Sequence, residues 1–289
     1  MAHLFQYWLF LFFKFLLEHL PKSGREGFLN LIVQLLYLIL KRYRIVVRKN
    51  LEIAFGSNFA EQHYKDWAKR CIRNLLDNFL IVIENLNRTP EEVRNLAIFK
   101  NREKIEPILK EGKSILFVSA HFWHWEMLGA IMASHFGKAN GVAEKLKNRY
   151  FNDILYRSRA KFGIQPIPMK GAIRNLIRAI RRNENIFILI DQAVNRGQGI
   201  EFPFFGTTSI HAETTNYLSK KFGIPIVHVY ISDIQQGKYV IEFEEPIWGD
   251  EVEHTIPKEL AIIENRIRSN PTKWLWCHRR WKNLGDIYR

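Results

Sequence analysis

A histidine and a glutamate stand five positions apart in the stretch VSAHFWHWEMLG, which spans residues 118–129. His121 follows a short apolar run, and Glu126 lies in the first turns of the helix expected after it. A free histidine has a pKa of about 6.5, and a carboxylate that orients the imidazole and raises its basicity makes it a general base at neutral pH. These residue types therefore allow proton-transfer chemistry at this point.

The geometry requires a break in the helix between the two residues. Within one continuous helix, side chains five positions apart point about 140° away from each other. If His121 lies on the loop and Glu126 on the helix, the carboxylate can reach back to the imidazole, and the helix N-terminus offers N–H groups to a developing oxyanion. A histidine and a glutamate at this spacing also occur by chance, so an aromatic core that contains a few polar atoms is the alternative interpretation.

Strands and helices alternate along the chain from about residue 60 onwards. The run 113–120 is short and apolar, as expected for a buried parallel strand, and 123–136 has a helical pattern. Further strands are expected at 163–169, 185–190, 224–231 and 238–245, and further helices at 61–86, 148–162, 172–182, 211–223 and 259–269. This order predicts an α/β fold with a mixed sheet flanked by helices, in which reactive residues gather where strands end.

The N-terminus is apolar and aromatic enough to suggest a membrane-associated helix. Residues 4–20 reach the lower limit for a bilayer span, although Gln6, Lys14 and Glu18 interrupt them. The segment could span weakly or lie in the interface. A second apolar run at 28–40 leads into the basic block 41–49, which suits an anionic cytoplasmic leaflet. The alternative is that both runs are core helices of a soluble protein.

The overall charge indicates anionic partners. The 289 residues include 43 Lys+Arg and 29 Asp+Glu, which gives a formal net charge of +14. Such a charge fits nucleic acid, an anionic membrane, or acidic and phosphorylated partners. Two cysteines without metal-ligand spacing favour a reducing compartment and no metal site.

Seven stretches occur in an order and spacing that carry a family resemblance. They are RKNLEIAFG (48–56), SAHFWHWEMLG (119–129), RSRAKFG (157–163), PMKGAIRNLIRAI (168–180), LIDQ (189–192), FPFFGT (202–207) and PTKWLWCHRRWK (271–282). From about residue 40 to residue 282, the chain resembles the bacterial lipid A biosynthesis acyltransferase family, which is related to glycerolipid acyltransferases that use an H-x4-D/E dyad. The resemblance implies a glycerolipid-acyltransferase-like domain at 41–289, after a membrane-associated helical segment at 1–40.

The resemblance assigns the dyad to His121 and Glu126. Many relatives have Gly and Asn where this chain has Trp123 and His124, so Trp123 could reshape the entrance of the site. We expect His124 to be hydrogen-bonded beside the site and not to act as a second base.

Three further residues are implied as substrate-binding residues. Arg159 matches an arginine of the family, and its guanidinium suits a phosphate or a thioester carbonyl, although it could also belong to a solvated basic helix face. Asp191 ends a buried strand, where a carboxylate needs a partner, and could orient the acceptor or Arg159, or cap a loop. Gln192 accompanies it.

The resemblance implies an O-acyltransferase that needs no metal, no cofactor and no covalent acyl-enzyme. The donor would be acyl-carrier protein or acyl-CoA, and the acceptor a hydroxyl of a phosphorylated glycolipid, a lipid A precursor. The protein would sit on the anionic leaflet of the bacterial inner membrane with its catalytic domain facing the cytoplasm.

Two alternatives stay open. One is an acyltransferase for another lipid acceptor, such as a lysophospholipid, a phosphatidylinositol mannoside or an ornithine lipid. The other, more remote, is a basic membrane-tethered binding protein. The sequence contains no RNA-recognition aromatic pattern, no helix-turn-helix signature and no zinc spacing, so we do not expect nucleic acid as a partner.

Overall fold

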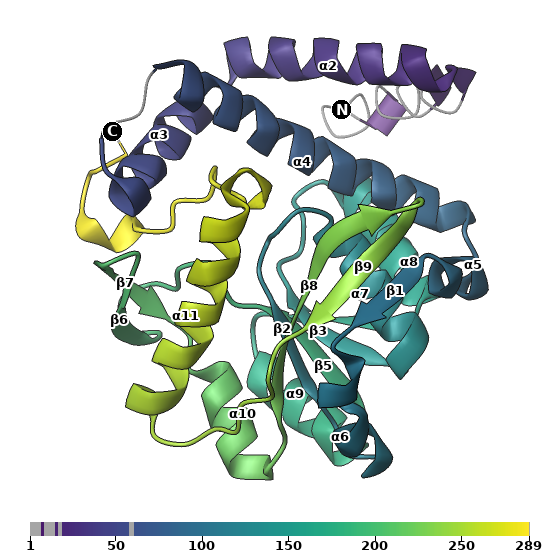
Figure 1. Cartoon of the computed structure of the whole chain (residues 1–289), viewed down its shortest axis with the longest axis vertical. Helices are drawn as coiled ribbons and strands as arrows, with labels where there is room; N and C mark the ends of the chain where they lie inside the picture. The colour runs from purple at the N-terminus through teal and green to yellow at the C-terminus, as the bar shows by residue number, and fades with distance from the viewer. Residues whose placement is uncertain (1–6, 9–14, 17–18, 58–60, 289) are drawn as a thin grey trace.

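A seven-stranded sheet forms the centre of the computed structural model, which describes residues 7–8, 15–16, 19–57 and 61–288 (Figure 1). Its strand order is β1-β9-β8-β2-β5-β3-β4, and every neighbouring pair is parallel except β8 and β9. The strands are β1 (Ala97–Lys100), β2 (Leu116–Ser119), β3 (Ala139–Ala143), β4 (Ile164–Pro168), β5 (Asn185–Leu189), β8 (Ile226–Gln235) and β9 (Lys238–Phe243). The expected α/β fold with a mixed sheet is confirmed.

Helices cover both faces of this sheet. The helices of the described chain, including α2, which packs on α4 and not on the sheet, are α2 (Lys22–Ile39), α3 (Lys41–Phe55), α4 (Glu61–Asn87), α5 (Pro90–Asn95), α6 (Glu106–Lys110), α7 (Trp125–Phe136), α8 (Arg149–Lys161), α9 (Ala172–Arg181), α10 (Thr214–Phe222) and α11 (Val252–Ser269). Because side chains alternate along a strand, Phe117 of β2 packs with α7 on one face. Its neighbours Leu116 and Val118 pack with α9 and α10 on the other face.

The register of the central strands β2 and β5 determines which of the residues after them lie side by side. β2 and β5 are parallel neighbours, with Ser119 opposite Leu189. The residues two positions beyond each strand, His121 and Asp191, therefore leave the sheet side by side at its carboxyl edge. This edge is where open parallel sheets usually bind their ligands.

A hairpin and the C-terminal segment form a second, aromatic core beside the sheet. The hairpin pairs β6 (Ile200–Phe204) with β7 (Thr207–His211). Phe204 and Phe205 at its turn are buried among the tryptophans of the C-terminal segment, which are Trp274, Trp276 and Trp281. The stretch 202–206 is thus an aromatic turn that packs on the core.

The N-terminal helix α2 lies against α4 at one end of the molecule (Figure 1). Ion pairs join Arg25 to Glu84 at 2.7 Å and Arg73 to Glu26 at 2.9 Å. Most of the first expected membrane segment, including Gln6, Lys14 and Glu18, lies outside the described residues. Within the part of the chain that is described, none of the helices has both the length and the apolarity to cross a bilayer.

Four strands, β1, β3, β6 and β7, were not predicted from the sequence, and one helix was predicted too short. β1 and β3 are short, and neither has the continuous apolar run that marks β2 and β5. The last long helix was expected at 259–269, but α11 begins at Val252 and includes Pro257. The buried Thr255 and Ile256 anchor the turn before this proline, so packing holds a helix start that propensity alone disfavours.

Candidate active site

His121 and Asp191 form the central contact at the carboxyl edge of the sheet. The Nδ1 atom of His121 lies 2.9 Å from Oδ1 of Asp191. The Asp191 side chain is 2% exposed and the His121 side chain 20% exposed. A hydrogen bond from Nδ1–H to the carboxylate leaves the lone pair on Nε2, which is the tautomer that a general base requires.

Glu126 does not contact His121, which corrects the expected geometry of the dyad. Its carboxylate accepts two hydrogen bonds from Arg159, from Nε at 3.1 Å and from Nη2 at 2.6 Å. The Nε1 atom of Trp125 donates a third at 3.2 Å. Arg159 is therefore neither part of a solvated basic face nor paired with Asp191: it is forked onto Glu126, and both side chains are largely buried.

The backbone between β2 and α7 explains this change of partner. Trp123 adopts a positive φ of 48°, and its N–H donates to the carbonyl of Lys273 at 2.7 Å. This bend allows α7 to begin at Trp125, whose ring stands edge-on to His121 at 5.3 Å. The indole thus occupies the side of the imidazole that faces α7, and the Glu126 side chain extends to Arg159 on α8.

The C-terminal segment holds the site together, and the sequence analysis did not assign it this role. Trp274 donates from Nε1 to Oδ2 of Asp191 at 2.8 Å. Phe122 and Trp274 form an antiparallel bridge, and the N–H of Leu275 donates to the carbonyl of His121 at 3.1 Å. The motif PTKWLWCHRRWK contains this tryptophan, but nothing in its pattern indicates which carboxylate the indole meets.

The electrostatics keep Asp191 ionised. Burial by itself raises the pKa of this carboxyl, but the charge and hydrogen bond of His121 and the hydrogen bond of Trp274 outweigh burial and lower the pKa to about 2. An ionised aspartate fixes the imidazole in one orientation and stabilises the imidazolium that forms when Nε2 takes a proton.

Gln192 lies beside Nε2 of His121, the ring nitrogen that does not contact Asp191. Its Nε2 atom is 3.4 Å from Nε2 of His121. The expected oxyanion donors at the start of α7 are partly occupied, because the N–H of Glu126 donates to Oδ1 of Asn78 at 3.1 Å. The N–H of Trp123 is bound to Lys273, so neither group is available to a reacting oxyanion.

His124 is partly buried, and it is not hydrogen-bonded in the expected way. Its ring stacks on Trp123 at 4.8 Å, and its Nδ1 atom has no hydrogen-bond partner among the described residues. Burial is the main reason that its pKa falls to about 4. Lys273 lies 3.6 Å from the centre of the Trp123 ring, so the tryptophan is clamped between a cation and an imidazole.

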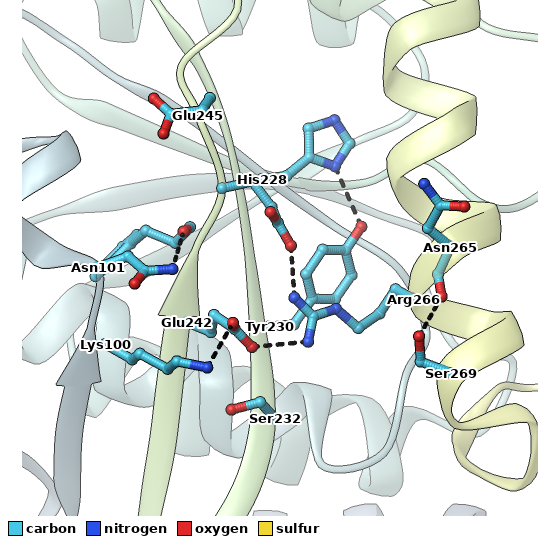
Figure 2. Close-up of polar contacts among 12 residues, drawn as sticks. Lys100, Asn101, His228, Tyr230, Ser232, Glu242, Glu245, Asn265, Arg266 and Ser269 are labelled. Carbon is cyan, nitrogen blue, oxygen red and sulfur yellow. Dashed lines mark hydrogen bonds and ion pairs between the residues drawn. The ribbon is translucent and has the colours of Figure 1, made fainter.

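A second histidine–carboxylate pair lies inside the protein, on β8 and α11. His228 Nε2 is 3.6 Å from Oε1 of Glu259, and both side chains are fully buried. Thr215 donates to the other carboxylate oxygen at 2.8 Å, and Nδ1 of His228 contacts the hydroxyl of Tyr230 at 3.1 Å. Figure 2 shows that contact, together with the Arg266 guanidinium beside the tyrosine ring, 5.0 Å from its centre.

Arg266 joins this buried network to two glutamates, one on β9 and one just after it. Its Nη1 atom is 2.8 Å from Glu242 (Figure 2), and its Nη2 atom is 2.5 Å from Glu244. The Tyr230 ring packs edge-on against Phe122, the residue after His121, at 6.0 Å. The second pair therefore packs, through Tyr230, against the residue after His121, but it does not contact His121 itself. No cluster of three or more histidine, cysteine or acidic side chains suited to a metal ion occurs among the described residues.

Comparisons with known proteins show which family this chain matches. The family model described as bacterial lipid A biosynthesis acyltransferase matches residues 1–283. A lipid A biosynthesis acyltransferase of Haemophilus influenzae is 22% identical over 288 residues, which cover 97% of this chain and 90% of the relative. A lipid A biosynthesis palmitoleoyltransferase of Escherichia coli is also 22% identical, over 84% of this chain and 80% of the relative.

Proposed function

Because this chain belongs to the bacterial lipid A biosynthesis acyltransferase family and is an acyltransferase, we propose that it moves a fatty acyl chain from an acyl thioester to a hydroxyl of a lipid A precursor. The observation that supports this best is the state of His121, held at Nδ1 by the buried Asp191 while its side chain stays accessible. A histidine held in this way has one ring nitrogen available as a general base.

In the proposed reaction, Nε2 of His121 removes the proton of the acceptor hydroxyl while the hydroxyl oxygen attacks the thioester carbonyl carbon. The C–S bond of the tetrahedral intermediate then breaks, an ester forms, and the imidazolium returns the proton to the departing thiolate. Asp191 stabilises the imidazolium between these two steps. The sequence requires no covalent acyl-enzyme, because the acceptor oxygen attacks the donor directly.

Glu126 and Arg159 act as one unit in this proposal. Their forked, largely buried pair fixes the start of α7 against α8 and so holds the bend that carries His121. The pair uses Nε and Nη2 of Arg159, and we assign the remaining guanidinium donors to the developing oxyanion or a substrate phosphate. Gln192, next to Nε2 of His121, is assigned to the acceptor hydroxyl.

The charge and the N-terminal helices support a membrane location. Leu31, Leu35, Leu38 and Ile39 of α2 are each about half exposed or more, and they recur at helical spacing. We propose that residues 1–40 attach the acyltransferase domain, residues 41–289, to the anionic leaflet of the inner membrane, on its cytoplasmic side. A protein of net charge +14 also suits an acidic acyl-carrier protein or acyl-CoA as donor and a phosphorylated glycolipid as acceptor.

The proposal is tested by acyl transfer in detergent solution, with acyl-carrier-protein and CoA thioesters as donors and a lipid A precursor as acceptor. His121→Ala should lower turnover by at least about 10³-fold, because the proposed base is lost. His254→Ala is the matched control, since this histidine is 66% exposed, and it should leave turnover unchanged. Equal turnover of His121→Ala and wild type would refute the proposed chemistry.

The acceptor is tested separately. A panel that adds a lysophospholipid, a phosphatidylinositol mannoside and an ornithine lipid should show a clear preference for the lipid A precursor. Mass spectrometry of lipid A from cells that lack and then regain the protein should show one acyl chain lost and restored. If the protein prefers another acceptor, the proposed acyl-transfer reaction stands and the proposed lipid A acceptor is wrong.

A further inference from the structure

A cavity with no candidate site residue in its lining lies where α2, α3 and α4 meet, at one end of the molecule (Figure 1). Its cavity has a volume of about 210 Å³. Three cations line it, and they are Lys41, Arg44 and Arg48 of α3. Tyr37 of α2 and Tyr64 of α4 form aromatic walls, and Glu61 supplies the one carboxylate in the lining.

The cations in this cavity are not equally neutralised. Arg48 forms an ion pair with Glu61 and lies 4.5 Å from the centre of the Tyr64 ring. Arg44 is held over the Tyr37 ring at 4.8 Å. In the described part of the chain, no carboxylate pairs with Lys41 or Arg44. The cavity therefore keeps an excess of positive charge inside aromatic walls, which favours a small anion.

Exposed aliphatic side chains of α2 precede the cavity residues of α3 in the sequence, so a ligand that also contacts them needs an apolar part. The exposed aliphatic row of α2 ends in Leu38 and Ile39, which are 66% and 73% exposed and stand just before Lys41 in the sequence. A ligand that satisfies both features carries a phosphate for the cavity and hydrocarbon for the row. Such a row lies at the level where acyl chains begin, and the adjoining cations then meet the headgroups.

We propose that this cavity binds the phosphate group of an anionic membrane phospholipid, at a site separate from the acyl-transfer site. The inference rests on the membrane attachment in the proposed function, and it names the residues that would bind a lipid there. An acidic protein partner fits less well, because the cations line a cavity next to an aliphatic row and do not form a convex polar face.

The test compares neighbouring arginines in vesicle binding. Arg44→Ala removes a cation from the cavity, whereas Arg42→Ala removes an exposed cation two positions away that does not line it. Wild-type protein should bind phosphatidylcholine vesicles that contain phosphatidylglycerol more tightly than pure phosphatidylcholine vesicles. Arg44→Ala should weaken this binding about tenfold and Arg42→Ala no more than about threefold, because only one of them loses a direct phosphate contact.

Calorimetry with soluble probes separates the lipid from other anions. Dihexanoyl-phosphatidylglycerol below its micelle concentration should bind wild type saturably and Arg44→Ala weakly, and inorganic phosphate should bind wild type much more weakly than the lipid. Three outcomes would overturn the assignment. The first is an equal loss of lipid binding in both variants, and the second is equal affinity of wild type for phosphate and lipid. The third is an Arg44→Ala variant that loses only the binding of acyl-carrier protein.

Two outcomes distinguish this inference from the function on which it rests. If wild type binds no vesicles, both the membrane attachment and the lipid site fail. If wild type binds anionic vesicles but Arg44→Ala behaves like Arg42→Ala, only the lipid site fails. Acyl transfer in detergent should be the same for both variants, because no described contact joins Arg42 or Arg44 to His121 or Asp191.

Discussion

Two histidine–carboxylate pairs lie on the same sheet, and they differ in access. His121 and Asp191 are 2.9 Å apart at the carboxyl edge, and the imidazole is 20% exposed. His228 and Glu259 are 3.6 Å apart and fully buried, with Tyr230 and Thr215 as further contacts. Pairing alone therefore does not identify a base. An imidazole must also present its second nitrogen to a substrate, and of these two only His121 does.

The same chemical change in both pairs gives the sharpest test of this comparison. Asp191→Asn should lower kcat by about 10³- to 10⁴-fold, because a neutral amide neither fixes the tautomer nor stabilises the imidazolium. Glu259→Gln should change kcat by less than about threefold at a temperature where the variant is folded, because its pair does not meet substrate. Steady-state kinetics with both variants measures this, and similar losses in kcat would erase the distinction.

The second prediction concerns stability. His228→Leu should lower the free energy of unfolding by about 3–5 kcal/mol, because it leaves the Glu259 carboxylate buried without its histidine. His121→Ala should lower it by less, about 1–3 kcal/mol, because the buried Asp191 carboxylate loses its histidine but keeps the hydrogen bond from Trp274. Urea denaturation followed by tryptophan fluorescence measures both values. The reverse order would mean that the accessible pair is the structural one.

The third prediction concerns the pH dependence of stability and His278, a partly buried histidine whose charge would interact with His121 and Asp191. Burial lowers the pKa of His278 to about 4, whereas the unfolded chain titrates at about 6.5. Because the unfolded state binds the proton first, stability is complete above pH 6.5 and falls as the pH drops towards 4, by up to about 1.4 kcal/mol per pH unit for this group. His278→Gln should flatten that slope in denaturation at several pH values. An unchanged slope would remove His278 from the acid response.

The sequence predicted much of the fold and the reacting residue, for local reasons. Apolar runs such as 113–120 and 185–190 predict buried strands, and helical periods predicted α4, α7, α8, α9 and α10 closely. His121 was identified because it follows one of these strands. β1 and β3 were missed because neither contains the continuous apolar run that marks β2 and β5.

The candidate site was predicted less completely than the fold. Glu126 was expected beside His121 because it is near in the sequence, and the structure instead pairs it with Arg159. Asp191 was selected from its position at a strand end, but its contact with His121 was not foreseen. Trp274 was not assigned to the site, since an indole donor to a buried carboxylate leaves no periodic signal.

By itself, the sequence determined that an imidazole would stand at the end of a buried strand in a basic α/β protein, because hydrophobic period and charge are properties of short segments. Only the tertiary structure decided which carboxylate serves it. Strand order made β2 and β5 neighbours and aligned Ser119 with Leu189, so that residues 70 positions apart leave the sheet together. Such an alignment depends on long-range hydrogen bonding between strands, which local patterns do not encode.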